Sequence, residues 1–133
     1  MSYQITRRQG NLNGTLINAS FVTAQQTSAD QANTNGSGVI VVLDVTALKV
    51  GGMANTALTL LIQGKDSASG KYYTLLTSDP VSTLSTVVYM LSPDIPHVPA
   101  RTVRSLLPAT WRVLVKASNA NPVSYTVGCS VIQ

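Results

Sequence analysis

Side chains that could do acid–base, nucleophilic or metal chemistry are few in this sequence. The carboxylates come from five aspartates and no glutamate, and His97 is the only histidine. Enzyme sites usually need several titratable groups that converge in one cleft. A metal site at His97 would need at least two more ligands, and only Asp94 is close to it in the sequence. We therefore predict no catalytic, cofactor-binding or metal-binding residues, and a protein that is not an enzyme.

The segment GKDSASGK at 64–71 invites comparison with a phosphate-binding loop. That motif needs four residues between its glycines and a helix after its lysine. Here five residues separate Gly64 from Gly70, Tyr72 follows the lysine, and a strand-like segment comes next. We predict a hairpin turn instead, in which Asp66 caps the turn and Gly70 adopts a positive φ.

The charges are sparse and scattered, although the formal net charge is +4. Only the pair Arg7 and Arg8 and the pair Arg101 and Arg104 approach a cluster, so we predict solvated or interface charge and no specific nucleic-acid binding. No segment approaches the ~18 consecutive apolar residues of a membrane span, and the N-terminus lacks the apolar core of a signal peptide. We expect a protein that is made soluble in the cytoplasm and does not bind a membrane.

The chain is rich in Val and Thr, which favours strands over helices. Alternating apolar residues predict strands at 15–24, 39–47, 56–63, 71–77, 86–91, 110–116 and 123–131. Trp111 alternates with Val113 and Val115, which indicates a core anchor, and Cys129 falls on the apolar face of the last strand. Residues 25–37 are expected to form a polar loop.

Four prolines between residues 93 and 108 exclude central-strand pairing over most of that stretch. Within it, residues 100–107 could form one or two helical turns with Val103, Leu106 and Leu107 facing inward. The predicted fold is an all-β, single-domain antiparallel β-sandwich of about seven strands over residues 15–133. Residues 1–14 precede it as an extended N-terminal arm.

Four segments together resemble a group of small structural proteins from tailed bacteriophages and their prophages. They are GVIVVLDVT at 38–46, GKDSASGKYYTLL at 64–76, LPATWRV at 107–113 and YTVG at 125–128. The resemblance covers residues 38–133 and implies a virion structural protein, above all a capsid decoration (cement) protein that binds and stabilises the assembled shell. It implies the major capsid protein or other virion proteins as partners, a virion location, and a homo-oligomer, with a trimer as the state that fits capsid symmetry.

In this interpretation the arm would contact the partner. Arg7 and Arg8 could meet carboxylates on a capsid surface, while Tyr3 and Ile5 bury apolar area; the alternative is a frayed terminus. Two other functions stay open. The near one is a minor tail or head–tail subunit, and the distant one is a host-surface or carbohydrate-binding β-sandwich module.

Overall fold

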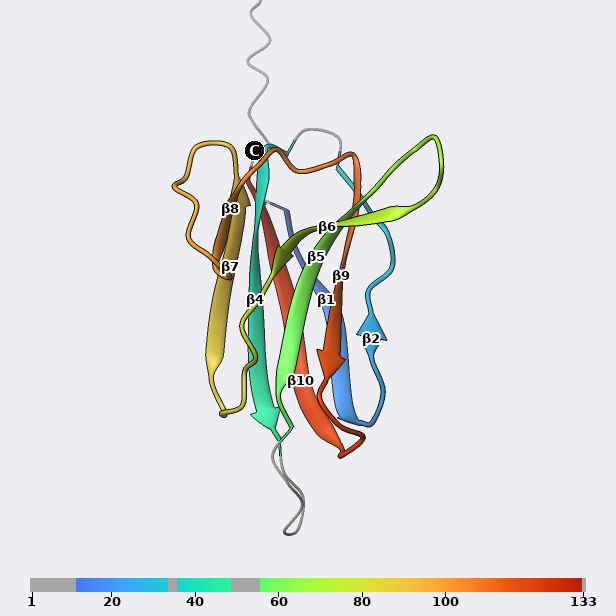
Figure 1. Cartoon of the computed structure of the whole chain (residues 1–133), viewed down its shortest axis with the longest axis vertical. Helices are drawn as coiled ribbons and strands as arrows, with labels where there is room; N and C mark the ends of the chain where they lie inside the picture. Colours follow the sequence, from blue (N-terminus) through green and yellow to red (C-terminus); the bar gives the residue numbers. More distant parts are fainter. Residues whose placement is uncertain (1–11, 34–35, 49–55, 133) are drawn as a thin grey trace, which may run out of the picture.

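The computed structural model describes residues 12–33, 36–48 and 56–132, and these residues form an all-β fold without a helix (Figure 1). The strands are β1 (Leu12–Val22), β2 (Gln26–Thr27), β3 (Gln31–Ala32), β4 (Gly38–Ala47), β5 (Leu58–Lys65), β6 (Tyr72–Thr77), β7 (Thr86–Ser92), β8 (Thr102–Arg104), β9 (Thr110–Ala117) and β10 (Val123–Ile132). Accordingly, this part of the chain contains no helix long and apolar enough to cross a membrane.

The strands form two sheets that pack face to face (Figure 1). Sheet A has the order β1-β10-β4-β7-β8, and sheet B has the order β2-β9-β5-β6 with β3 also paired to β9. Every pair of strands is antiparallel except β7 and β8, which are parallel. The predicted all-β sandwich is therefore confirmed, with one parallel pair that the sequence did not predict.

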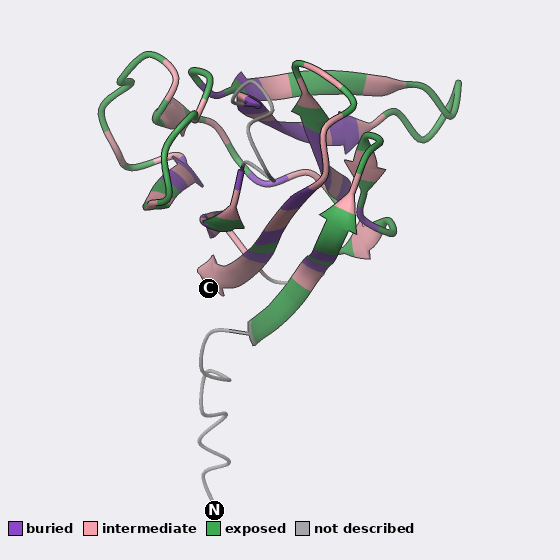
Figure 2. Cartoon of the chain, turned by 90° about the horizontal axis from the view of Figure 1, so that it is seen from below, coloured by how far each residue is buried: buried purple, intermediate pink, exposed green. Residues whose placement is uncertain are grey.

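The core lies between the sheets, where the buried positions concentrate (Figure 2). Its inward side chains follow the predicted alternation, because successive residues of a strand point to opposite faces. In β9, Trp111, Val113 and Val115 are all buried, as predicted. In β10, Val123, Tyr125 and Val127 are buried, whereas Cys129 and Val131 at the end of the strand are only half-buried.

The predicted polar loop at 25–37 contains two short strands, β2 and β3, both paired with β9. The anchor is Ser28, whose backbone N–H donates to the Val113 carbonyl at 2.8 Å and whose Oγ accepts the Val113 N–H at 2.9 Å. A small polar residue thus extends the sheet through its own side chain. β1 also begins at Leu12, three residues before the predicted start at 15, so part of the predicted arm belongs to the sandwich.

The helical turns predicted at 100–107 are wrong. Residues Thr102–Arg104 form β8 beside β7, and Leu106 is 66% exposed rather than inward, while Leu107 is buried. The Thr102 hydroxyl donates to the Pro96 carbonyl at 2.7 Å and accepts the Val98 N–H at 2.8 Å. These bonds tie the segment to the proline-rich stretch before it and hold it extended.

The buried tyrosine of β10 makes the stability of the fold sensitive to alkaline pH. Burial raises the pKa of Tyr125 to about 12. An unfolded tyrosine ionises near pH 10, so above that pH the unfolded state loses a proton that the folded state keeps. We expect the free energy of unfolding to fall by roughly 2 to 3 kcal/mol between pH 10 and pH 12 from this residue alone.

Urea unfolding followed by circular dichroism over this pH range tests the expectation. Tyr125→Phe should lose less stability than wild type as the pH rises. The matched control is Tyr73→Phe, which removes the hydroxyl of an exposed tyrosine outside the core. Equal slopes for wild type and Tyr125→Phe would contradict the prediction.

Candidate interaction surface

The predicted contact residues Tyr3, Ile5, Arg7 and Arg8 lie outside the described residues. His97 is exposed in the loop between β7 and β8, and the described part of the chain contains no group of three or more potential metal ligands. The glycine-rich segment after β5 is a hairpin turn followed by the strand β6, as predicted. Asp66 accepts hydrogen bonds from the Ser69 hydroxyl and backbone, and Gly70 has a φ of +73°.

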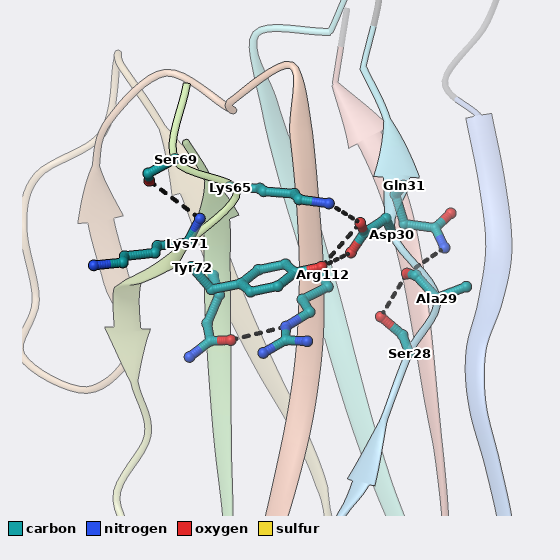
Figure 3. Close-up of polar contacts among 10 residues, drawn as sticks. Ser28, Ala29, Asp30, Gln31, Lys65, Ser69, Lys71, Tyr72 and Arg112 are labelled. Atoms are coloured by element: carbon teal, nitrogen blue, oxygen red, sulfur yellow. Dashed lines mark hydrogen bonds and ion pairs between the residues drawn. The ribbon is translucent and has the colours of Figure 1, made fainter. Parts of the chain in front are cut away.

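A polar cluster on sheet B joins segments that are far apart in sequence (Figure 3). Asp30, between β2 and β3, accepts the Tyr72 hydroxyl at 2.8 Å and pairs with Lys65 Nζ at 3.2 Å. The Arg112 guanidinium lies 3.4 Å from the centre of the Tyr72 ring, and its Nε donates to Gln63 Oε1 at 2.9 Å. The cluster therefore fixes the β2–β3 segment to β5, β6 and β9.

Electrostatics in this cluster favour the charged forms of its ion pair. The hydrogen bond from Tyr72, more than the neighbouring Lys65, lowers the pKa of Asp30, and the hydrogen bond to Asp30 raises the pKa of Lys65. Each of the five side chains contacts another member of the cluster, so the arrangement fixes one segment to another. Sequence reasoning missed it because the fold alone brings Asp30 next to residues of β5 and β6.

The outer face of sheet A carries an apolar patch. Ile40 pairs with Met90 and Val42 with Val88 across β4 and β7, so these four side chains form two adjacent rows that point away from the core. We call these four residues the sheet A patch. Val88 is 48% exposed, and the other three are half-buried. The apolar runs at 39–43 and 87–91 predict these strands, but they do not tell whether the outer face is covered, and no described strand covers it.

A hollow of about 480 Å³ lies beside the patch. It opens where Gly128 of β10 leaves space between Thr15 of β1 and Val42 of β4, and Asn13 and Ser130 form its polar side. The other lining residues are Gly14 and Cys129. Burial raises the pKa of the Cys129 thiol, which agrees with the expected small apolar role rather than with a reactive thiolate.

Strand β1 is the free edge of sheet A next to this hollow. Its sequence LNGTLINASFV contains no charged residue and no proline over 11 residues, and within the described chain no strand pairs with its other side. Natural sheets usually protect long edges with charge, proline or bulges. Two irregularities interrupt β1, between Thr15 and Ile17 and between Ala19 and Val22. The edge thus offers short regular stretches for pairing.

Phe21 sits in the second irregularity and is 62% exposed. Its φ of 50° is in the left-handed region, which is strained for an aromatic residue, and its N–H donates to Ser124 Oγ at 2.9 Å. Strained residues often occur at binding sites. The ring at one end of β1 is therefore a further exposed apolar side chain, which no sequence pattern predicted.

Comparison of the chain with protein-family models and with curated proteins found no match.

Proposed function

We propose that this protein is a structural virion protein of a tailed bacteriophage, most specifically a capsid decoration (cement) protein. In this role it binds the major capsid protein or other virion proteins as a homo-oligomer, for which a trimer is the proposed state. The resemblance of the four sequence segments supports the virion context. The observation that carries the proposal in the structure is the sheet A patch on β4 and β7, on the same sheet as the uncharged edge strand β1, from which β10 separates it.

Contiguous exposed apolar patches rimmed by polar residues mark protein–protein contacts more often than chance. The patch residues Ile40 and Val42 lie on β4, whose backbone is paired on both sides. Val88 and Met90 lie on β7, which is paired with β4 and, from Met90 on, also with β8. A partner would therefore meet a preorganised surface and would not have to order it.

The rest of the molecule suits the same role. A two-layer sandwich is a rigid scaffold, and an unpaired strand edge can add to a partner's sheet. Many copies on one shell would bind with high avidity, so each contact can be modest. The arm residues Tyr3, Ile5, Arg7 and Arg8 remain part of the proposal as a further contact.

Co-sedimentation with empty capsids and, separately, with purified tails of the same phage tests the proposal. Saturable binding to capsids is the expected result. Val88→Lys should weaken that binding by about tenfold or more, because it places a charge at the centre of the apolar contact. The control is Leu84→Lys in the loop before β7, where the side chain is 65% exposed and outside the patch.

Each result decides between the candidate roles. Binding to tails alone would replace the decoration role with that of a minor tail or head–tail subunit. Binding to neither would overturn the virion proposal and turn attention to host-surface or carbohydrate ligands. Equal capsid binding by Val88→Lys and Leu84→Lys, with both variants folded, would show that the sheet A patch is not the contact.

A further inference from the structure

The outer face of β4 carries an ordered pattern of three side chains. Ile40, Val42 and Asp44 follow one another at every second residue, so all three point away from the core, about 6.7 Å apart. Asp44 is half-buried and accepts a hydrogen bond from the Thr86 hydroxyl at 2.9 Å. It forms no ion pair with any other residue of the described chain. The pattern along the strand is therefore apolar, apolar, acidic.

The N-terminal sequence carries the complementary pattern at the same spacing. Tyr3, Ile5 and Arg7 also follow one another at every second residue, with the polar Gln4 and Thr6 between them. In an extended chain the side chains of Tyr3, Ile5 and Arg7 would lie on one side. Their order is apolar, apolar, basic. Laid alongside β4 in the same direction, Tyr3 would meet Ile40, Ile5 would meet Val42, and Arg7 would meet Asp44.

We propose that the segment 1–8 of a second copy of this chain docks on the outer face of sheet A, running parallel to β4. Ile5 would then lie over Val42 at the rim of the hollow above Gly128, where the sheet leaves space for a side chain. Val88 and Met90 of β7 would flank the docked segment, because they are paired with Val42 and Ile40.

Strand direction identifies the second copy as the source of the segment. β1 and β4 both pair antiparallel with β10, so they run in the same direction. A chain that reversed before Leu12 to cover its own sheet would run antiparallel to β1 and hence to β4. Arg7 would then lie near Ile40, and Tyr3 near Asp44, so the charges would not meet. The matching order needs a segment that comes from another copy.

Reach constrains this arrangement. With residues 1–8 docked, only residues 9–11 link Arg8 to Leu12, and this link spans about 14 Å at most, so the β1 edge of one copy must lie within that distance of the neighbour's β4. The inference deepens the proposed function and rests on it in one respect, namely that the protein works as an assembly of copies. It gives the contact arm a specific partner, which is the patch of a neighbouring copy.

Disulfide cross-linking between two different variants of the full chain tests the inference. Both carry Cys129→Ala, which removes the only native thiol; one adds Ile5→Cys and the other adds Val42→Cys. Mixed under mild oxidation, they should give a cross-linked heterodimer on a non-reducing gel. The matched control replaces Ile5→Cys with Gln4→Cys, whose side chain would point away, and should yield several times less product.

Two results would overturn the inference. One is an equal yield from the Ile5→Cys and Gln4→Cys variants. The other comes from a single chain that carries both Ile5→Cys and Val42→Cys: a disulfide that forms within that chain, at a rate independent of its concentration, would show docking on the same copy.

A charge exchange examines the polar end of the contact. Arg7→Glu should weaken self-association in sedimentation equilibrium by up to about fivefold, the range of exposed ion pairs. Combining it with Asp44→Lys should restore the association, whereas a merely structural role of Asp44 would leave the double variant no better than either single one. Neither experiment uses capsids. Failed cross-linking with intact capsid binding would thus overturn this inference alone, and lost capsid binding with intact cross-linking would overturn only the proposed function.

Discussion

Replacing Trp111 by alanine is expected to lower the free energy of unfolding by about 3 to 5 kcal/mol, the usual cost of removing a large aromatic side chain from a core. Trp111 is 1% exposed in β9 and belongs to the core between the two sheets. The loss combines the transfer of its apolar surface with the cavity left behind. Urea unfolding followed by far-ultraviolet circular dichroism measures it, because the variant lacks the only tryptophan as a fluorescence probe.

The companion variant Trp111→Phe separates packing from hydrogen bonding. The buried indole Nε1 has no hydrogen-bond partner among the described residues, so its removal forfeits no hydrogen bond. Phenylalanine should therefore cost less than half as much stability as alanine, because it refills most of the space. A cost for Trp111→Phe as large as that for Trp111→Ala would show that the indole N–H contributes to stability after all.

The elements that the sequence predicted well are those whose signal is local. Period-two alternation identified Trp111, Val113 and Val115 as inward, and the turn after β5 followed from the chemistry of Asp66 and Gly70. In each case, neighbouring residues alone decide the conformation. The backbone at these positions would behave in much the same way in many all-β folds.

The elements that the sequence did not predict depend on partners distant in the chain. β8 exists because Thr102–Arg104 finds the free side of β7, and β2 exists because Ser28 bonds to Val113. No local pattern distinguishes such a segment from a loop or a helical turn, since the deciding hydrogen bonds come from other strands. Short edge strands are where local propensity has the least influence.

The candidate interaction surface also has a part that was predicted from the sequence and a part that only the fold shows. The sequence predicted contact residues in the arm, whereas the sheet A patch and the exposed Phe21 emerged only from the fold. A continuous apolar run such as that at 39–43 predicts a strand, but it does not tell whether a second layer covers the outer face. That depends on the connections of the chain. The patch therefore follows from topology rather than from composition.

Gly38, at the start of β4, provides the second large expected effect. A Cβ atom at this position would lie 2.3 Å from the Leu91 carbonyl oxygen and 3.0 Å from the Ser92 Cα, both in the backbone of β7. Backbone atoms cannot rotate away as a side chain can, so Gly38→Ala must separate the ends of two central strands. We expect a loss of about 3 kcal/mol in the free energy of unfolding.

Gly128→Ala is the matched control for Gly38→Ala, because both glycines lie in neighbouring central strands of sheet A. A Cβ atom at Gly128 would come no closer than 3.6 Å to its nearest neighbour, the Gly14 carbonyl oxygen. Alanine there should leave stability unchanged or raise it by up to about 1 kcal/mol, since it restricts the unfolded chain. The difference between the two variants isolates the contact between the strands. Equal effects would mean that the ends of β4 and β7 separate easily, and that the rigidity ascribed to the sheet A patch does not extend to this end of the sheet.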